Sequence, residues 1–196
     1  MENIEITRVT PAEIKLLQTI SRQTFSETFS AANSSEDMQK YLAGAFSVEK
    51  LTAELNDKNT EFYFARLHNQ VIGYLKINTG ASQTELHDEN ALEIERIYVL
   101  QQYHGKAVGQ LLYEKAFLLA RQIKARYVWL GVWEENPRAI SFYKKNGFVA
   151  FSTHVFMLGN DAQTDIIMKL DIAGKDEVLF LPYFCGRLAW FLLQQN

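Results

Sequence analysis

The sequence predicts an α/β (α+β) fold in a single domain, and three observations indicate this class. Short runs that alternate polar and apolar residues, or are rich in β-branched and aromatic residues, are separated by longer runs with helical spacing of apolar residues. Residues 92–125 combine both kinds, because a strand pattern, a glycine-bearing loop and a helix pattern follow in direct succession. The chain of 196 residues, 47% hydrophobic and 22% charged, suits one globular domain, which we expect over residues 1–171.

The chain is expected to begin with a strand at residues 4–9, where polar and apolar residues alternate. Thr10 followed by Pro11 is a typical helix start, with proline in the first helical position. Residues 35–55 continue the helical pattern, and Ser47 provides a further capping position within them. We therefore expect a first strand, a long helix and a further helical segment.

The rest of the domain is predicted to contain both strands and helices. A short polar connection between two strand patterns suits a hairpin, and Asn146 with Gly147 is a typical helix end. A polar loop is expected at residues 78–90 and a turn at 159–161. The expected strands are residues 61–67, 71–77, 92–100, 127–133, 148–157 and 165–170, and the expected helices lie around residues 111–120 and 136–146.

The loop inside residues 92–125 has the character of an anion site. Gly105 and Gly109 lie directly before the predicted helix. Several backbone N–H groups of such a loop can point at one spot, where the positive end of the helix adds to them, so a pyrophosphate would fit. The spacing matches neither a P-loop, G-x-x-x-x-G-K-[ST], nor a dinucleotide loop, G-x-G-x-x-G.

Gln102, Gly105 and Ala107 instead give the pattern Q-x-x-G-x-G/A, and a second motif follows at residues 136–148. The two motifs together resemble the GCN5-related N-acetyltransferase (GNAT) superfamily, whose loop binds acetyl-CoA. The resemblance implies a mixed, mostly antiparallel sheet that is flanked by helices and splayed between its fourth and fifth strands. Ala107 replaces the commoner glycine, and its Cβ narrows the approach of the backbone to phosphate.

The resemblance extends to the PaiA-type spermidine/spermine N-acetyltransferases and covers residues 4–170. It implies that acetyl-CoA is the donor and that polyamines are the candidate acceptors. The further segments that carry it are residues 24–29, 73–78, 129–134, 154–159 and 163–165.

Two residues are the expected catalytic groups. Tyr143 matches the family's tyrosine that protonates the departing CoA sulfur, and Glu95 matches the strand carboxylate that acts as base in polyamine-type members. A primary amine has a pKa of roughly 10, so at neutral pH some group must take its proton. Glu93 shares a strand face with Glu95, because side chains alternate. A packing role for Tyr143 beside Phe142, an electrostatic role for Glu95 and a water chain as base remain alternatives.

The resemblance also implies which residues contact the two substrates. The arm of CoA is expected to pair with the backbone of the fourth strand, and Asn136 would contact that arm, cap a helix, or do both. The expected acetyl-CoA contacts are Ile97, Tyr98, Val99, Gln102, His104, Gly105, Lys106, Ala107, Val108, Gly109, Gln110, Asn136 and Tyr143. The expected contacts of the amine are Phe25, Glu93, Trp133 and Glu134.

Composition limits the other classes of function. The net charge of −3 argues against a general nucleic-acid binder. Cys185 is the single cysteine, which excludes an internal disulfide and a cysteine-based metal cluster. The four histidines, His68, His87, His104 and His154, show no ligand spacing, so we expect no metal site. Without a signal segment or a long apolar run, we expect a cytoplasmic protein that makes no membrane contact and whose partner is a small-molecule amine.

The C-terminal tail, residues 172–196, is more apolar than a solvated tail but too short in its apolar runs to cross a bilayer. We expect it to pack on the domain or on a second copy of the chain, which would form a homodimer.

Two other functions stay open at this point. One is acetylation of another small amine or a protein terminus, which residues 25–55 would decide, and the other is a non-catalytic regulator that binds acyl-CoA.

Overall fold

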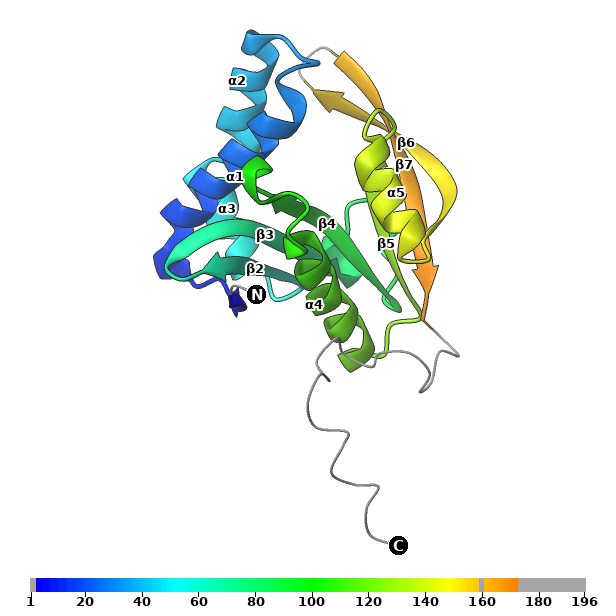
Figure 1. The fold of residues 1–196 in the computed structure, drawn as a ribbon. Coiled ribbons are helices and arrows are strands. Elements are labelled where there is room, and N and C mark those ends of the chain that lie inside the picture. Colours follow the sequence, from blue (N-terminus) through cyan, green and yellow to red (C-terminus); the bar gives the residue numbers. More distant parts are fainter. Residues whose placement is uncertain (1–2, 159–160, 173–196) are drawn as a thin grey trace, which may run out of the picture.

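A seven-stranded sheet with the strand order β1-β2-β3-β4-β5-β7-β6 forms the centre of the computed structural model, which describes residues 3–158 and 161–172 (Figure 1). Neighbouring strands are antiparallel except β4 and β5, which are parallel. The predicted fold class is therefore confirmed. The strands are β1 (Ile4–Arg8), β2 (Thr60–Leu67), β3 (Gln70–Thr79), β4 (Ala91–Val99), β5 (Tyr127–Trp133), β6 (Val149–Leu158) and β7 (Asp161–Asp171).

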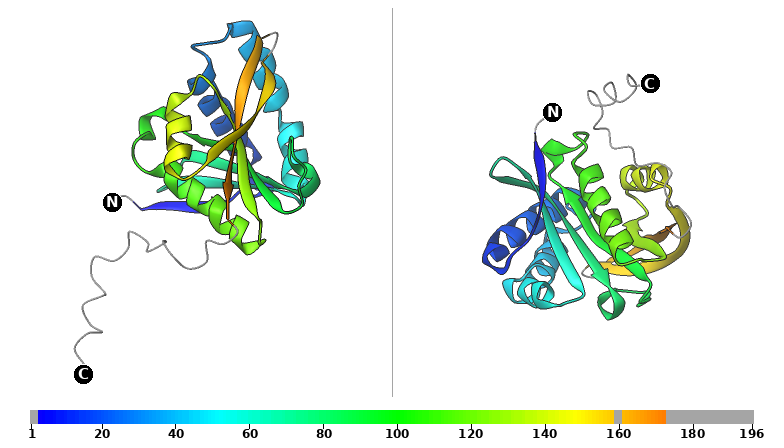
Figure 2. Two further views of the ribbon diagram at one scale, coloured as in Figure 1. Left: turned by 90° about the vertical axis from the view of Figure 1, so that its right-hand side faces the viewer. Right: turned by 90° about the horizontal axis from the view of Figure 1, so that it is seen from below.

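Five α-helices cover the two faces of the sheet within the described ranges (Figure 2). The first three helices pack on one face, where Leu17, Phe25 and Leu51 meet Phe62 and Tyr74 of the sheet. The last two pack on the opposite face. The helices are α1 (Ile14–Phe29), α2 (Ser35–Ala45), α3 (Val48–Asn56), α4 (Val108–Gln122) and α5 (Pro137–Lys145).

Local sequence signals explain where the helices begin. Thr10 and Glu13 form a capping box before α1, with Pro11 in the short 3₁₀ turn between them. The Ser34 hydroxyl accepts a hydrogen bond from the Asp37 N–H at the start of α2. The Ser47 hydroxyl caps α3 in the same way. The cap at Ser47 therefore divides the predicted helical segment 35–55 into α2 and α3.

Two predicted boundaries were wrong. The last strand begins at Asp161, not at residue 165, because the hairpin with β6 continues beyond the end of β5 and pairs Leu158 with Asp161. The polar loop begins after Thr79, since β3 still pairs with β2 and β4 near its end. Residues 159–160 of the predicted turn lie outside the described ranges.

Strand β4 contains a β-bulge at Glu95. Its pairing with β3 passes from Arg96 directly to Ile94, so Glu95 is the extra residue. A bulge shifts the alternation of side chains by one position. Ile94 and Ile97 therefore both pack toward α4, while Glu95 and Arg96 both make ion pairs on the opposite face of the sheet.

The prediction for the apolar tail concerns residues outside the described ranges, apart from Ile172, whose N–H donates to the Arg126 carbonyl over 2.8 Å. In residues 3–158 and 161–172, no helix combines the length and hydropathy needed to cross a bilayer.

Gly73 allows β3 and β4 to approach each other, and its substitution tests this contact. A Cβ added at Gly73 would lie 2.7 Å from the Tyr98 carbonyl oxygen and 3.3 Å from the Val99 Cα. We expect Gly73→Ala to lower the free energy of unfolding by about 1–3 kcal/mol, because backbone must move. Gly44→Ala in α2 is the control, since nothing lies within 4 Å and helix propensity predicts a gain of up to ~1 kcal/mol. Urea denaturation measures both, and equal effects would contradict this account.

Candidate functional site

The site lies where β4 and β5 separate. Their parallel pairing comprises three residue pairs, which end at Glu93 opposite Trp129. Beyond this point the two strands diverge, and a cleft of about 260 Å³ opens between them. The predicted splay of the sheet between its fourth and fifth strands is thus present.

One wall of the cleft is aromatic. Phe25 lies at its centre, with ring centroids 4.4 Å from Phe29 and 4.6 Å from Tyr41. Trp133 of β5 extends the wall, because its ring centroid lies 5.3 Å from that of Phe29. The residues of this aromatic wall are Phe25, Phe29, Tyr41, Phe46, Tyr98 and Trp133.

Acidic side chains predominate among the charged residues of the cleft. Glu85, Glu93, Glu95 and Asp165 line it, against one guanidinium, that of Arg96. Because Arg96 is itself paired with carboxylates, the cleft has an excess of negative charge. Negative charge within a low-dielectric cleft concentrates cations there.

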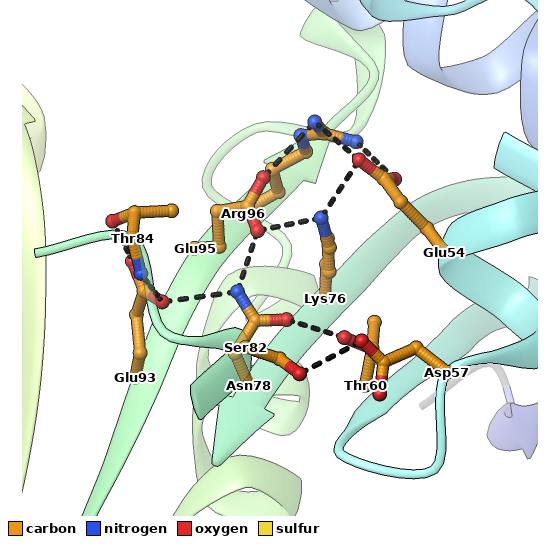
Figure 3. A network of polar contacts seen from close by, with 10 residues as sticks. All are labelled: Glu54, Asp57, Thr60, Lys76, Asn78, Ser82, Thr84, Glu93, Glu95 and Arg96. Carbon is orange, nitrogen blue, oxygen red and sulfur yellow. Dashed lines mark hydrogen bonds and ion pairs between the residues drawn. The ribbon is translucent and has the colours of Figure 1, made fainter. Parts of the chain in front are cut away.

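Four side chains beside the cleft form a closed ring of alternating charges (Figure 3). Lys76 Nζ lies 3.0 Å from Glu54 Oε1 and 2.5 Å from Glu95 Oε2. Arg96 closes the ring, with its guanidinium 3.2 Å from Glu54 and 2.9 Å from Glu95. All four side chains are at most 16% exposed, so solvent screens these pairs weakly. The charge ring joins α3, β3 and β4.

The charge ring determines the protonation of Glu95. Burial raises the pKa of its carboxyl, but Arg96 and Lys76 outweigh burial and hold the pKa below its ordinary value. Asn78 Nδ2 also donates to Glu95 Oε2 over 2.6 Å. Both oxygens of Glu95 are thus occupied by donors. The predicted role of Glu95 as base stays a prediction, and this environment favours its alternative, an electrostatic role.

Glu93 is held in a similar way. The Thr84 N–H and hydroxyl donate to its carboxylate over 2.9 and 2.5 Å, and Asn78 Nδ2 donates over 2.9 Å (Figure 3). Burial raises the pKa of Glu93, although the hydrogen bonds from Thr84 and Asn78 lower it. Glu93 is therefore a cleft carboxylate whose two oxygens both already accept hydrogen bonds.

The loop before α4 presents backbone donors. Gly105 and Ala107 have φ values of 79° and 61°, so both lie in the left-handed region. The first hydrogen bond within α4 runs from the Leu111 N–H to the Ala107 carbonyl over 3.1 Å. The N–H groups of Val108 and Gly109 consequently have no acceptor inside the helix. This arrangement suits a phosphate group.

Several predicted side chains of this loop contact protein groups. His104 Nε2 lies 2.8 Å from the Val99 carbonyl, and its Nδ1 accepts from Arg138 on α5. Gln110 donates to Glu114 and to Asn146 Oδ1, over 3.1 and 3.3 Å. Lys106 Nζ lies 4.9 Å from the ring centroid of Tyr103, and Gln102 is exposed. The backbone N–H groups, rather than these side chains, are therefore the free donors at the loop.

Tyr143 and Asn136 line the cleft from α5. Tyr143 is 6% exposed, and its ring centroid lies 5.4 Å from Phe142 and 5.6 Å from Phe148. Burial raises the pKa of Tyr143, so its hydroxyl stays protonated at neutral pH. The Asn136 side chain accepts from the Ala139 N–H over 3.0 Å and thereby caps α5. Capping does not exclude the predicted contact of Asn136 with CoA.

The structure brings together many, but not all, of the predicted site residues. Val99, the loop 102–110 and Glu134 do not line the cleft, whereas Phe25, Glu93, Glu95, Ile97, Tyr98, Trp133, Asn136 and Tyr143 do. Sequence reasoning missed Tyr41, Glu85, His154 and Asp165, which also line it. The pairing of β7 with β5 places Asp165 opposite Trp133, and this register was the missing signal.

The family model of the GNAT acetyltransferases matches residues 18–148. The chain belongs to the GNAT acetyltransferase family. An uncharacterised N-acetyltransferase of Lactobacillus delbrueckii subsp. lactis is 40% identical to this GNAT enzyme over 169 residues, which cover 86% of this chain and 98% of the relative. The prediction of this family, and of an acetyltransferase, is thus confirmed.

A curated relative and a solved structure are also similar to this GNAT acetyltransferase. The spermidine N(1)-acetyltransferase of Thermoplasma acidophilum is 25% identical over 150 residues, which cover 74% of this chain and 88% of that one. The crystal structure of the PaiA N-acetyltransferase from the same organism, in complex with coenzyme A, has a TM-score of 0.72 at 23% identity. It covers 86% of this chain and 99% of the PaiA chain, and this likeness is one of fold.

Arg96 tests whether the charge ring supports the GNAT fold. Arg96→Met leaves two buried carboxylates with Lys76 as their one cation in the ring, so we expect the free energy of unfolding to fall by about 3 kcal/mol or more. Arg8→Met is the matched control, because Arg8 pairs with Glu61 at an exposed site, where a loss of at most ~1 kcal/mol is expected. Guanidinium denaturation compares the two, and similar losses would show that the charge ring adds no stability.

Proposed function

We propose that this enzyme transfers the acetyl group of acetyl-CoA to a primary amine of a polyamine such as spermidine or spermine. The observation that carries the proposal is the composition of the cleft, in which an aromatic wall faces four carboxylates and one guanidinium. A polyamine combines several cationic nitrogens with apolar methylene segments. Carboxylates and aromatic faces both attract ammonium groups, and rings also pack against methylenes.

The similarity to a spermidine N(1)-acetyltransferase supports the same acceptor class. The match spans 74% of this chain and 88% of that relative. At 25% identity the similarity supports an amine of this kind without identifying it.

The residues present fit acetyl-CoA as the donor. The unpaired N–H groups at the start of α4 and the left-handed positions Gly105 and Ala107 would hold its pyrophosphate. Beyond Glu93, the edge of β4 that faces β5 has no strand partner, so its backbone is available to the pantetheine arm. Bound acetyl-CoA would supply the thioester whose acetyl group moves to the amine.

The chain's own groups would then supply three effects. A backbone N–H of β4 in the region of Ile97 to Val99 would stabilise the charge that develops on the carbonyl oxygen. The Tyr143 hydroxyl would donate a proton to the departing sulfur. Glu93 and Glu95 would hold the cationic acceptor by charge.

The first test of this function is a comparison of acceptors. We expect release of free CoA from acetyl-CoA to be fastest with spermidine or spermine, because these amines match both the charge and the aromatic wall. The amines compared with them are a monoamine, an amino acid, an aminoglycoside and a peptide with a free N-terminus. Faster turnover with any of these amines would assign another acceptor. Binding of acetyl-CoA without amine-dependent release would favour a regulator.

Tyr143 tests the proposed acid. Tyr143→Phe is expected to lower kcat by about 10²-fold or more, because the sulfur would leave without a proton donor. The affinity for acetyl-CoA, measured by calorimetry, should stay within about two-fold, since the ring that packs on Phe148 is retained. Tyr113→Phe is the matched control, because Tyr113 is a buried tyrosine outside the cleft. Loss of acetyl-CoA binding in Tyr143→Phe would instead assign Tyr143 a packing role.

A further inference from the structure

Asp165 is a cleft carboxylate that no hydrogen bond or ion pair holds within residues 3–158 and 161–172. It lies on β7 directly opposite Trp133 of β5. A Cβ placed on Gly131 would lie 3.4 Å from Asp165 Oδ2, so the carboxylate extends over Gly131. Gly131 belongs to the part of β5 that has already separated from β4. The Asp165 carboxylate therefore overhangs the opening in the sheet.

The two faces of the sheet separate Asp165 from Tyr143. Trp133, the partner of Asp165 across the strands, contacts Phe29 of α1, so this side of the cleft is the side of the aromatic wall. Tyr143 belongs to the core between the sheet and α4, on the opposite side. For a thioester held between β4 and β5, Asp165 would thus lie on the side of the aromatic wall, from which the amine approaches, and Tyr143 would lie on the opposite side, near the sulfur.

The other cleft carboxylates are less suited to take a proton. Glu95 accepts from Lys76, Arg96 and Asn78, and Glu93 accepts from Thr84 and Asn78. Glu85 Oε1 lies 3.2 Å from His154 Nε2. A general base needs a free lone pair that faces its substrate, and Asp165 alone among the four cleft carboxylates has both oxygens free of such contacts in the described residues.

We propose that Asp165 is the general base that takes the proton from the ammonium group of the acceptor. This inference rests on the proposed acetyl transfer. Asp165 takes one proton from the nitrogen, and the lone pair so freed forms the C–N bond with the carbonyl carbon. The C–S bond breaks, its electron pair stays on sulfur, and sulfur takes the Tyr143 proton. After the C–N bond forms, the nitrogen carries a positive charge, and it loses its second proton to water to give the neutral amide. Asp165 returns its proton to solvent and Tyr143 regains one from there, so that the reaction releases one proton overall.

The surroundings of Asp165 suit a base that works near neutral pH. Burial raises the pKa of its carboxyl to about 6, Glu134 and Glu85 contribute to the rise, and His154 opposes it. The Asp165 carboxylate also helps to raise the pKa of Tyr41 of α2, so these two groups interact electrostatically. Most of the Asp165 population is then ionised at pH 7, while its basicity exceeds that of an ordinary aspartate.

The experiment measures kcat and kcat/KM for spermidine at saturating acetyl-CoA between about pH 5 and 9. For the unmodified enzyme we expect kcat/KM to rise with pH and level off above an apparent pKa of about 6. Asp165→Asn should lower kcat by about 10²-fold or more and remove this acidic limb. Asp171→Asn, the same change at an exposed position of the same strand, should preserve both the rate and the limb.

Two further variants separate the base from its neighbours and from folding. His154→Gln should keep the limb and move it to higher pH, because His154 lowers the pKa of Asp165. A group whose pKa is raised by folding lowers stability as the pH rises through that pKa. Above pH 6, Asp165→Asn should therefore unfold at the same temperature as the unmodified enzyme or at a higher one, so lost activity would not reflect lost structure.

The outcomes distinguish this proposal from the proposed function. An active enzyme whose Asp165→Asn variant keeps both kcat and the limb, or raises only KM, would overturn the role of Asp165 alone. Loss of the limb in His154→Gln would assign the titration to His154 and also overturn it. An unmodified enzyme that releases no CoA with any amine would overturn the proposed function, and the base with it.

Discussion

The separation of β4 from β5 is the constraint on which the rest of the structure depends. Each of these strands is paired along its other edge, β4 with β3 and β5 with β7, so the sheet stays intact although β4 and β5 share three residue pairs. The open edges would be costly if they were buried without partners. In this chain the Val99 carbonyl already accepts from a side chain, His104, so a loop residue satisfies part of the open edge. The cleft, the anion loop and the two proposed proton-transfer groups are all arranged around this gap.

The charge ring holds β4, the strand on one side of this gap, in a single arrangement. Buried ion pairs often contribute little net stability, because desolvation offsets the Coulomb attraction, and they are retained where they specify one arrangement. Here the bulge turns Glu95 and Arg96 to the same face, and Lys76 and Glu54 complete the ring from β3 and α3. The charge ring therefore connects β4, the strand that would hold the thioester, to β3 and to α3.

Much of the fold could be predicted from the sequence because its signals are local. The caps at Thr10 and Ser47, the strand before the loop and the glycine pattern all act within a few residues of one another. The loop motif also led directly to the correct family. The start of β7 was placed too late, because its first residues are polar and are held as a strand by pairing with β6 alone.

The candidate site was predictable only in part, because its chemistry depends on contacts between distant segments. Glu95 was identified from its strand, but its partners Lys76 and Asn78 come from β3, and their contacts favour an electrostatic role for this carboxylate. Asp165 reaches the cleft only through the register of β7 on β5, which no local pattern specifies.

The aromatic and the charged residues of the cleft come largely from different kinds of secondary structure. Phe25, Phe29 and Tyr41, which form much of the aromatic wall, belong to α1 and α2, whereas the carboxylates lie on or beside the strands. Exchange of residues on the two helices would reshape the space for the acceptor without moving the charged groups. A fold built in this way can diversify its choice of amine during evolution while the proposed acid and base keep their positions.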